Sequence, residues 1–89
     1  PYTKGSHDSD RELQLIEMRE NFMPILESGG VDVTLTGHSH IYERSMLIDG
    51  AYATPTVAEN VVLDDGDGNP NGDGAYRKSE GLHPNEGSV

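Results

Sequence analysis

The stretch "GGVDVTLTGHSH", residues 29–40, decides the predicted fold of this chain. Val31 to Thr36 alternate between apolar and polar side chains, and several of them are β-branched, which is typical of a β-strand. The segment Gly37-His38-Ser39-His40 follows directly at the carboxyl end of this strand. Ligands of open α/β sheets collect outside the carboxyl ends of strands, so this loop is the first candidate for a functional site.

A helix over about residues 10–28 is predicted ahead of the strand. Ser9 and Glu12 form an S-x-x-E capping box, which marks a helix start, and the pair Gly29-Gly30 marks its end. Pro24 lies inside the pattern, so we expect a kink or a shift to a new turn just before it. The predicted buried face comprises Leu15, Met18, Phe22 and Ile25 or Leu26. The predicted exposed face carries Glu12, Glu17, Arg19 and Glu20.

Helix, glycine turn and strand together predict one half of an α/β layer unit. Residues 42–48 are a second predicted strand, and weaker strand patterns cover residues 52–54 and 57–63. From Asp64 onward the chain is rich in Asp, Asn, Gly and Pro, and it cannot bury enough apolar area to fold by itself. We therefore expect an α/β portion at residues 1–63 and a long irregular acidic loop or insertion at residues 64–89.

The composition limits the possible functions. At 89 residues the chain is at most one small domain, whose core is marginal without metals or partners. The absence of cysteine excludes disulfides, thiolate metal sites and thiol nucleophiles. The net charge of -10 argues against binding to nucleic acids or anionic membranes and fits a protein that binds cations. No apolar run reaches the roughly 18–20 residues of a membrane span. The polar, loop-like ends lead us to expect a fragment of a larger chain.

His38 and His40 lie one residue apart in a chain with only 4 histidines. Two neutral imidazoles at this spacing can face one metal ion, or each can reach a different ion of a close pair. Imidazole together with oxygen ligands suits Zn, Fe or Mn. An exposed histidine pair without a metal is the alternative, because a metal site needs more than two ligands. His83, beside Pro84 near the end of the chain, is expected to be uninvolved.

The longer stretch "VDVTLTGHSHIYERS" resembles the last metal-binding motif, G-H-x-H, of the calcineurin-like metallophosphoesterases. Its extension H-x-Y-E-R-S resembles the purple acid phosphatase branch of that family. Residues 1–10, "PYTKGSHDSD", are similar to the segment that carries a phosphate-facing histidine in this branch. The resemblance covers roughly residues 1–50, and "GDGAYRK" is a weaker match to bacterial members. It implies the C-terminal part of a catalytic domain, whose fold is a β-sandwich flanked by helices.

The resemblance implies a role for each matching residue. His38 would ligate one metal of a dinuclear centre, and His40 would ligate the other. His7 would hydrogen-bond the substrate phosphate and help to protonate the leaving group, with an ordinary exposed loop histidine as the alternative. We interpret Tyr42, Glu43 and Arg44 as structural, with a phosphate contact by Arg44 as the lesser alternative.

The resemblance further implies hydrolysis of a phosphate ester by attack of a metal-bound hydroxide, with two ions of Fe, Zn or Mn. The earlier family motifs D-x-H, G-D-x-x-[DY] and G-N-H-[DE], which supply the other ligands, are absent. The remainder of the catalytic domain is therefore an expected partner, and this segment alone is expected to be inactive. Membership of the branch would also imply an extracytoplasmic or secreted location.

The acidic segment offers a second candidate site. Asp67, Asn69 and Asn71 occupy positions 1, 3 and 5 of an EF-hand-like loop, and Gly72 occupies its sharp turn. Lys78 stands where the loop needs a bidentate Glu, so a turn-rich surface insertion is the favoured interpretation. The alternative hypothesis for the chain is a small acidic, non-enzymatic calcium-binding or interaction module that uses residues 67–73.

Overall fold

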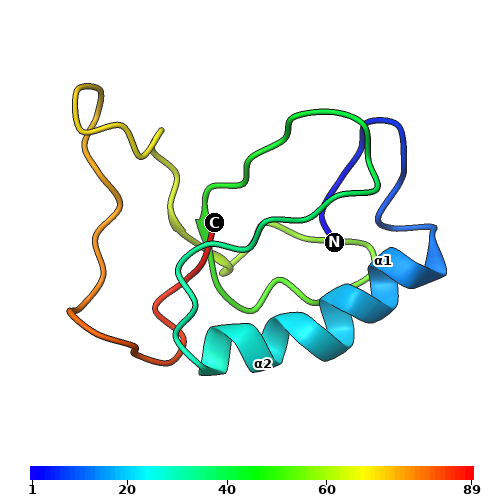
Figure 1. The fold of residues 1–89 in the computed structure, drawn as a ribbon, viewed down its shortest axis with the longest axis horizontal. Coiled ribbons are helices and arrows are strands. Elements are labelled where there is room, and N and C mark those ends of the chain that lie inside the picture. Colours follow the sequence, from blue (N-terminus) through cyan, green and yellow to red (C-terminus); the bar gives the residue numbers. More distant parts are fainter.

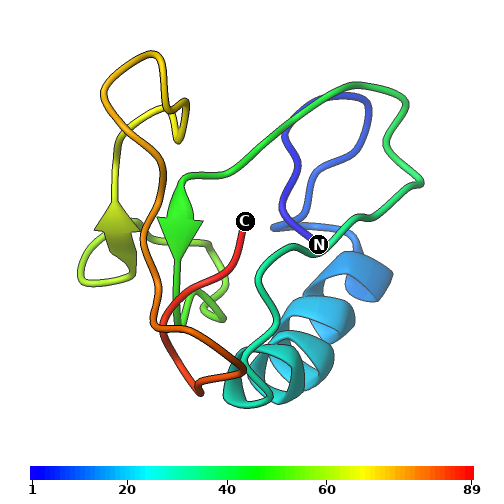
Figure 2. The same ribbon diagram turned by 60° about the vertical axis from the view of Figure 1, so that its left-hand side comes forward.

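The computed structural model describes all residues from 1 to 89. A helical segment runs through α1 (Leu13–Glu17), the π-helical turn η1 (Met18–Phe22) and α2 (Met23–Ser28). Two short strands follow, β1 (Leu47–Ile48) and β2 (Val62–Asp64). The helical segment lies along one side of the molecule, and long loops and the strand pair form the other side (Figure 1). The acidic segment leaves the strand pair as a long excursion and returns to it at the C-terminus (Figure 2).

The predicted capping box does not form, and the helix begins at Leu13. Glu12 is the N-cap residue but makes no side-chain capping bond. Its carboxylate turns back and accepts a hydrogen bond from the Asp8 backbone N–H at 3.1 Å. The buried Ser9 hydroxyl accepts the Thr3 backbone N–H at 3.1 Å instead of capping the helix. Both side chains are therefore used to hold the N-terminal loop, which delays the start of the helix.

The predicted shift inside the helix is present as the π-helical turn η1, which ends just before Met23 and Pro24. Proline has no N–H for the carbonyl four residues earlier, and its ring collides with that carbonyl in a regular α-helix. A π-turn widens the helix locally and is a common way to absorb such a disruption. The chain thus continues as a helix through Pro24 instead of ending there.

The end of the helix lies at the predicted glycine pair. Gly30 has φ of +78°, the Gly30 N–H donates to the Glu27 carbonyl at 3.1 Å, and the Val31 N–H donates to the Leu26 carbonyl at 3.1 Å. This pair of bonds around a left-handed residue is the Schellman motif, which satisfies the last free carbonyls of a helix. Local sequence alone therefore accounts for the helix stop.

We expect Gly30→Ala to lower the free energy of unfolding by about 2 kcal/mol, because a left-handed non-glycine residue costs on the order of 1–3 kcal/mol. The added Cβ would also lie 2.6 Å from the His83 backbone nitrogen, which cannot move aside easily. Gly29→Ala is the matched control, because Gly29 has φ of -83° and its Cβ would meet nothing closer than 3.3 Å. Urea unfolding followed by circular dichroism measures both variants. Equal destabilisation of the two would contradict this account.

The buried face of the helical segment differs from the prediction. The buried side chains follow an i, i+4 stripe made of Leu15, Arg19, Met23 and Glu27. The predicted core residues Met18, Phe22 and Ile25 are 41%, 53% and 66% exposed, and Leu26 is half-buried. Arg19, expected on the exposed face, is wholly buried. Polar loops cover this side of the helix, and their backbone groups need charged or hydrogen-bonding partners that apolar side chains cannot supply.

Glu27 shows how such a loop is held. Its carboxylate accepts the Gly50 backbone N–H at 3.0 Å and the Tyr52 hydroxyl, and its backbone carbonyl accepts the Asn85 N–H at 2.9 Å. Burial, followed by the hydrogen bond with Glu27, raises the pKa of Tyr52, so its hydroxyl remains a donor. The buried carboxylate therefore ties the loop at residues 50–52 to the end of the helix, and the backbone carbonyl of the same residue ties the loop at Asn85 to it.

The strands are shorter than predicted. β1 and β2 pair antiparallel, with Leu47 opposite Asp64 and Ile48 opposite Val62, and Ser88 forms an isolated antiparallel bridge to Ile48. Of the strand predicted at residues 42–48, only Leu47 and Ile48 form β1, and of the pattern at residues 57–63, only Val62 and Leu63 belong to β2. No strand forms at residues 52–54.

The strand predicted at residues 31–36 is not formed in this chain. Val33 and Leu35 are 57% and 91% exposed. Apart from the Val31 bond that ends the helix, backbone bonds join this stretch to another segment only at Thr34 and Asp32, which both bond to Val89. A strand exists only through hydrogen bonds to a neighbour, and the chain provides no strand long enough to pair with these residues.

The acidic segment contains no regular element after β2, as predicted, but its end is packed into the molecule. The Lys78 ammonium donates to the Gly87 carbonyl at 2.7 Å and pairs with Asp32 at 2.5 Å, and Ser88 is 1% exposed.

No helix has the length and apolar character that crossing a bilayer needs. The structure has a helical segment and a two-stranded sheet. The partial α/β layer unit is neither confirmed nor contradicted by them and stays a prediction.

Candidate metal centre

The N-terminal loop and the loop after residue 36 pack against each other, although they are far apart in the sequence (Figure 2). The Thr3 hydroxyl donates to the Ser39 hydroxyl at 2.9 Å, and the Ser6 and Ser39 hydroxyls lie 3.2 Å apart. The His40 backbone N–H donates to the Ser6 hydroxyl at 3.0 Å. Small hydroxyl side chains thus join the two loops that carry the candidate histidines.

A compact cluster of His7, Glu12 and His38 forms at this junction. His7 Nδ1 lies 2.8 Å and 3.0 Å from the two Glu12 carboxylate oxygens, and His38 Nε2 lies 3.3 Å from Oε2. The two imidazole rings stack with centroids 3.8 Å apart and an angle of 27° between their planes. One ligand atom from each residue lies within 4.8 Å of the others, so the group could hold a metal ion.

Glu12 is an anionic member of this cluster. Partial desolvation would raise its pKa, but hydrogen bonds with His7, with the Asp8 backbone N–H and with His38 outweigh this and hold the pKa below its ordinary value. The carboxylate is therefore ionised at neutral pH. An ionised carboxylate beside two imidazoles is a donor set that Zn, Fe and Mn accept.

His38 adopts an uncommon backbone conformation, with φ of +77°. A non-glycine residue in this region costs on the order of 1–3 kcal/mol and persists only where surrounding contacts fix it. Glu12 and the His7 ring are the contacts that the His38 side chain makes. The strained backbone of His38 thus coincides with the contacts of its ring to a second histidine and a carboxylate.

The structure separates His40 from this cluster. Its side chain is exposed, and the loop uses its backbone N–H to hold Ser6. His7 and His38 were predicted to serve one site, and they do lie together. The metal-binding roles of His38 and His40 stay predictions. Glu12 was not predicted as a site residue because its spacing from Ser9 indicated a helix cap. A carboxylate in the turn just after a candidate histidine was the signal available for it.

Glu43 and Arg44 hold loops in this structure. Glu43 Oε1 accepts the Lys4 backbone N–H at 3.1 Å, and hydrogen bonds from the Thr3 side chain and the Lys4 backbone lower its pKa. Arg44 Nη2 donates to the Asp67 carbonyl at 2.5 Å, which connects this loop to the acidic segment. These contacts agree with the structural interpretation of both residues. Tyr42 is 88% exposed.

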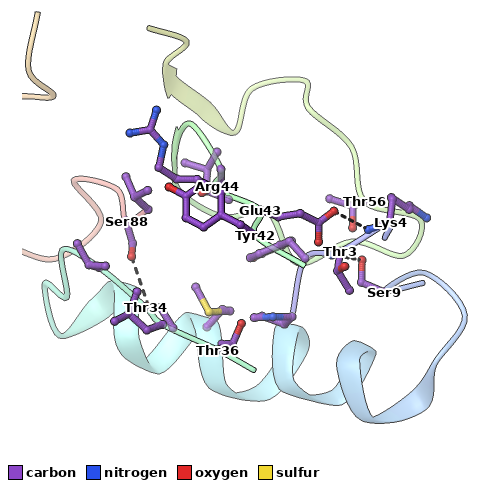
Figure 3. Close-up of a pocket in the computed structure, with 18 of the residues that line it drawn as sticks. Thr3, Lys4, Ser9, Thr34, Thr36, Tyr42, Glu43, Arg44, Thr56 and Ser88 are labelled. Carbon is purple, nitrogen blue, oxygen red and sulfur yellow. Dashed lines mark hydrogen bonds between the residues drawn. The ribbon is translucent and has the colours of Figure 1, made fainter. Parts of the chain in front are cut away.

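A cavity of about 800 Å³ lies beside the candidate centre but does not include His7, Glu12 or His38. Figure 3 shows Tyr42 and Arg44 at one wall, with Thr34 and Thr36 at the opposite one. The exposed Leu35 also lines it. The cavity therefore lies along residues 31–36, the stretch that was predicted to be a strand. No strand lies beside that stretch to pair with it.

The acidic loop is closed by its own hydrogen bonds. The Asp67 carboxylate accepts the Asn69 N–H at 2.8 Å, and the Asn69 side chain accepts the Asn71 N–H at 2.9 Å. A side-chain hydrogen bond between Asp67 and Asp73 raises the pKa of Asp73 and lowers that of Asp67. Calcium binding by this loop stays the alternative hypothesis to a turn-rich surface insertion. His83 makes a local contact, 2.7 Å from Nε2 to the Glu80 carbonyl.

Comparison of the sequence with curated proteins finds a relative among the purple acid phosphatases. The chain is 32% identical over 68 residues to purple acid phosphatase 18 of Arabidopsis thaliana. The match covers 76% of this chain but only 15% of the length of that protein. No protein-family profile matches the chain, and no solved structure matches it. The similarity is short and distant, and it points to a purple acid phosphatase-like origin for this segment.

Proposed function

We propose that this chain is a segment of a dinuclear-metal phosphoesterase of the purple acid phosphatase kind, which hydrolyses phosphate esters. The observation that carries the proposal is the 32% identity to purple acid phosphatase 18 over 76% of the chain. The packing of the His7 loop against the loop of His38 and His40 supports it, because one site needs both loops together.

In the intact enzyme His38 ligates one ion of Fe, Zn or Mn, and His40 ligates the other. Their imidazoles and the nearby carboxylate are the donor types that these metals accept. When bound, the two ions would supply positive charge to the phosphoryl group and activate a water as the nucleophile. His7 hydrogen-bonds the phosphate and helps to protonate the leaving oxygen.

The remainder of the catalytic domain is the partner of this segment in the proposal. It supplies the missing metal ligands, and the exposed side chains of Val33 and Leu35 offer it an apolar surface on which a neighbouring strand can pack. An extracytoplasmic or secreted location belongs to the same proposal. The segment by itself, with an incomplete ligand set, is expected to be inactive.

The test is hydrolysis of p-nitrophenyl phosphate by the full-length gene product before and after metal removal with a chelator. We expect hydrolysis that is lost after chelation and restored by Fe, Zn or Mn, because the ions are needed to activate the water. The 89-residue chain assayed in parallel is the control without the remaining ligands. Hydrolysis that survives complete metal removal, or a full-length protein without phosphatase activity, would refute the proposal.

A further inference from the structure

We propose that His7, Glu12 and His38 bind one transition-metal ion in this chain itself, with Zn²⁺ the best-suited ion. The site differs from the dinuclear centre proposed above, because it joins His38 to two residues of the N-terminal loop and does not use His40. The inference therefore rests on the geometry of this chain and not on the proposed function.

The distances between the ligand atoms fit a single small ion. Zn²⁺ binds imidazole nitrogen and carboxylate oxygen at about 2.0–2.2 Å in tetrahedral geometry, which places neighbouring ligand atoms roughly 3.3 Å apart. The His7 Nδ1 to Glu12 Oε1 distance is 2.8 Å, and the His38 Nε2 to Glu12 Oε2 distance is 3.3 Å. All three ligand atoms lie within 4.8 Å of one another.

The chemistry of the three donors also fits. Two histidines and one glutamate are the protein ligands of catalytic zinc sites in which a fourth position stays open to water. The Glu12 carboxylate contacts the ring nitrogens of His7 and His38, and no Lys or Arg forms an ion pair with it. A divalent cation would supply the compensating charge, in a chain whose net charge is -10.

The site is accessible and held in place by its surroundings. The side chains of His7, Glu12 and His38 are 31%, 30% and 54% exposed, so an ion can enter without unfolding the chain. The Asp8 N–H bond to Glu12 fixes the carboxylate relative to the N-terminal loop. The Thr3–Ser39 bond fixes that loop relative to the one that carries His38. Preorganisation of this kind lowers the entropy lost on binding.

The test uses the 89-residue chain, titrated with Zn²⁺ by calorimetry and with Co²⁺ by visible absorption. We expect one ion per chain and a Co²⁺ spectrum of tetrahedral type. His7→Ala, Glu12→Gln and His38→Ala should each weaken binding by roughly 100-fold or more, because loss of an outer partner alone costs about 10–100-fold. His83→Ala is the matched control, because His83 is exposed and its ring contacts the Glu80 carbonyl instead of any residue of the cluster. Circular dichroism verifies that each variant stays folded.

His40→Ala separates the two possible ligand sets. Loss of binding in His38→Ala and His40→Ala, with His7→Ala and Glu12→Gln unaffected, would overturn the inference in favour of the H-x-H pair. Absence of stoichiometric Zn²⁺ binding would overturn it as well. Neither result refutes the phosphoesterase proposal, which is tested separately by hydrolysis in the full-length protein.

Discussion

His40→Ala in the full-length protein should lower kcat/KM for the proposed phosphate-ester hydrolysis by at least about a thousandfold, which corresponds to about 4 kcal/mol of lost transition-state stabilisation. His38→Ala should have an effect of the same size, because each imidazole is proposed to hold a different ion. A two-metal site acts through both ions at once, on the attacking and on the leaving oxygen, so loss of either ion disables the reaction.

The fold of the segment should survive this substitution. The His40 side chain is exposed, and the contact that it makes to Ser6 comes from the backbone N–H, which alanine retains. The activity loss would then report on the metal centre and not on unfolding. His83→Ala, in the same protein and assay, should leave hydrolysis unchanged. Near-normal activity in His38→Ala or in His40→Ala would refute the assignment of that residue as a ligand.

Arg19→Met should lower the free energy of unfolding of the chain by about 3–5 kcal/mol, the usual cost of breaking a buried charge network by removing one partner. Arg19 is wholly buried. Its guanidinium donates to the Ser9 carbonyl at 2.6 Å, to the Thr54 hydroxyl at 2.7 Å and to the Pro1 carbonyl at 3.2 Å. Methionine fills part of the space but leaves these oxygens without a donor.

An effect of this size is a large share of the total stability, since a small domain is stable by only about 5–15 kcal/mol. Urea unfolding followed by circular dichroism gives the measurement, with Arg11→Met as the matched control because the Arg11 side chain is 86% exposed. Arg19→Lys should fall between the two, because one ammonium cannot reach every acceptor that the planar guanidinium bridges. Equal stabilities of the Arg11 and Arg19 variants would contradict a structural role for the buried guanidinium.

The helix could be predicted from its own residues, and so could the pairing of segments at the site. The glycine pair at residues 29–30 and Pro24 act through the backbone of a few neighbours, and the structure has the Schellman stop and the π-turn that they indicate. The motifs around His7 and His38 marked two loops that do lie together. Local sequence signals were sufficient where a backbone restriction acted, but the S-x-x-E motif of Ser9 and Glu12 was not, because the N-terminal loop uses both side chains.

Tertiary structure decided which helical side chains are buried, which stretch pairs as a strand and which residues complete the metal cluster. Arg19 is buried because distant loops bring carbonyl and hydroxyl oxygens to it, and residues 31–36 form no strand because no neighbouring strand reaches them. The Glu12 carboxylate makes no capping bond, and it contacts His7, the Asp8 backbone N–H and His38 instead. The sequence by itself determined where the backbone must turn or change pitch, since those constraints act within a few residues. Burial, strand pairing and ligand sets depend on segments brought from far along the chain, and only the fold specifies those.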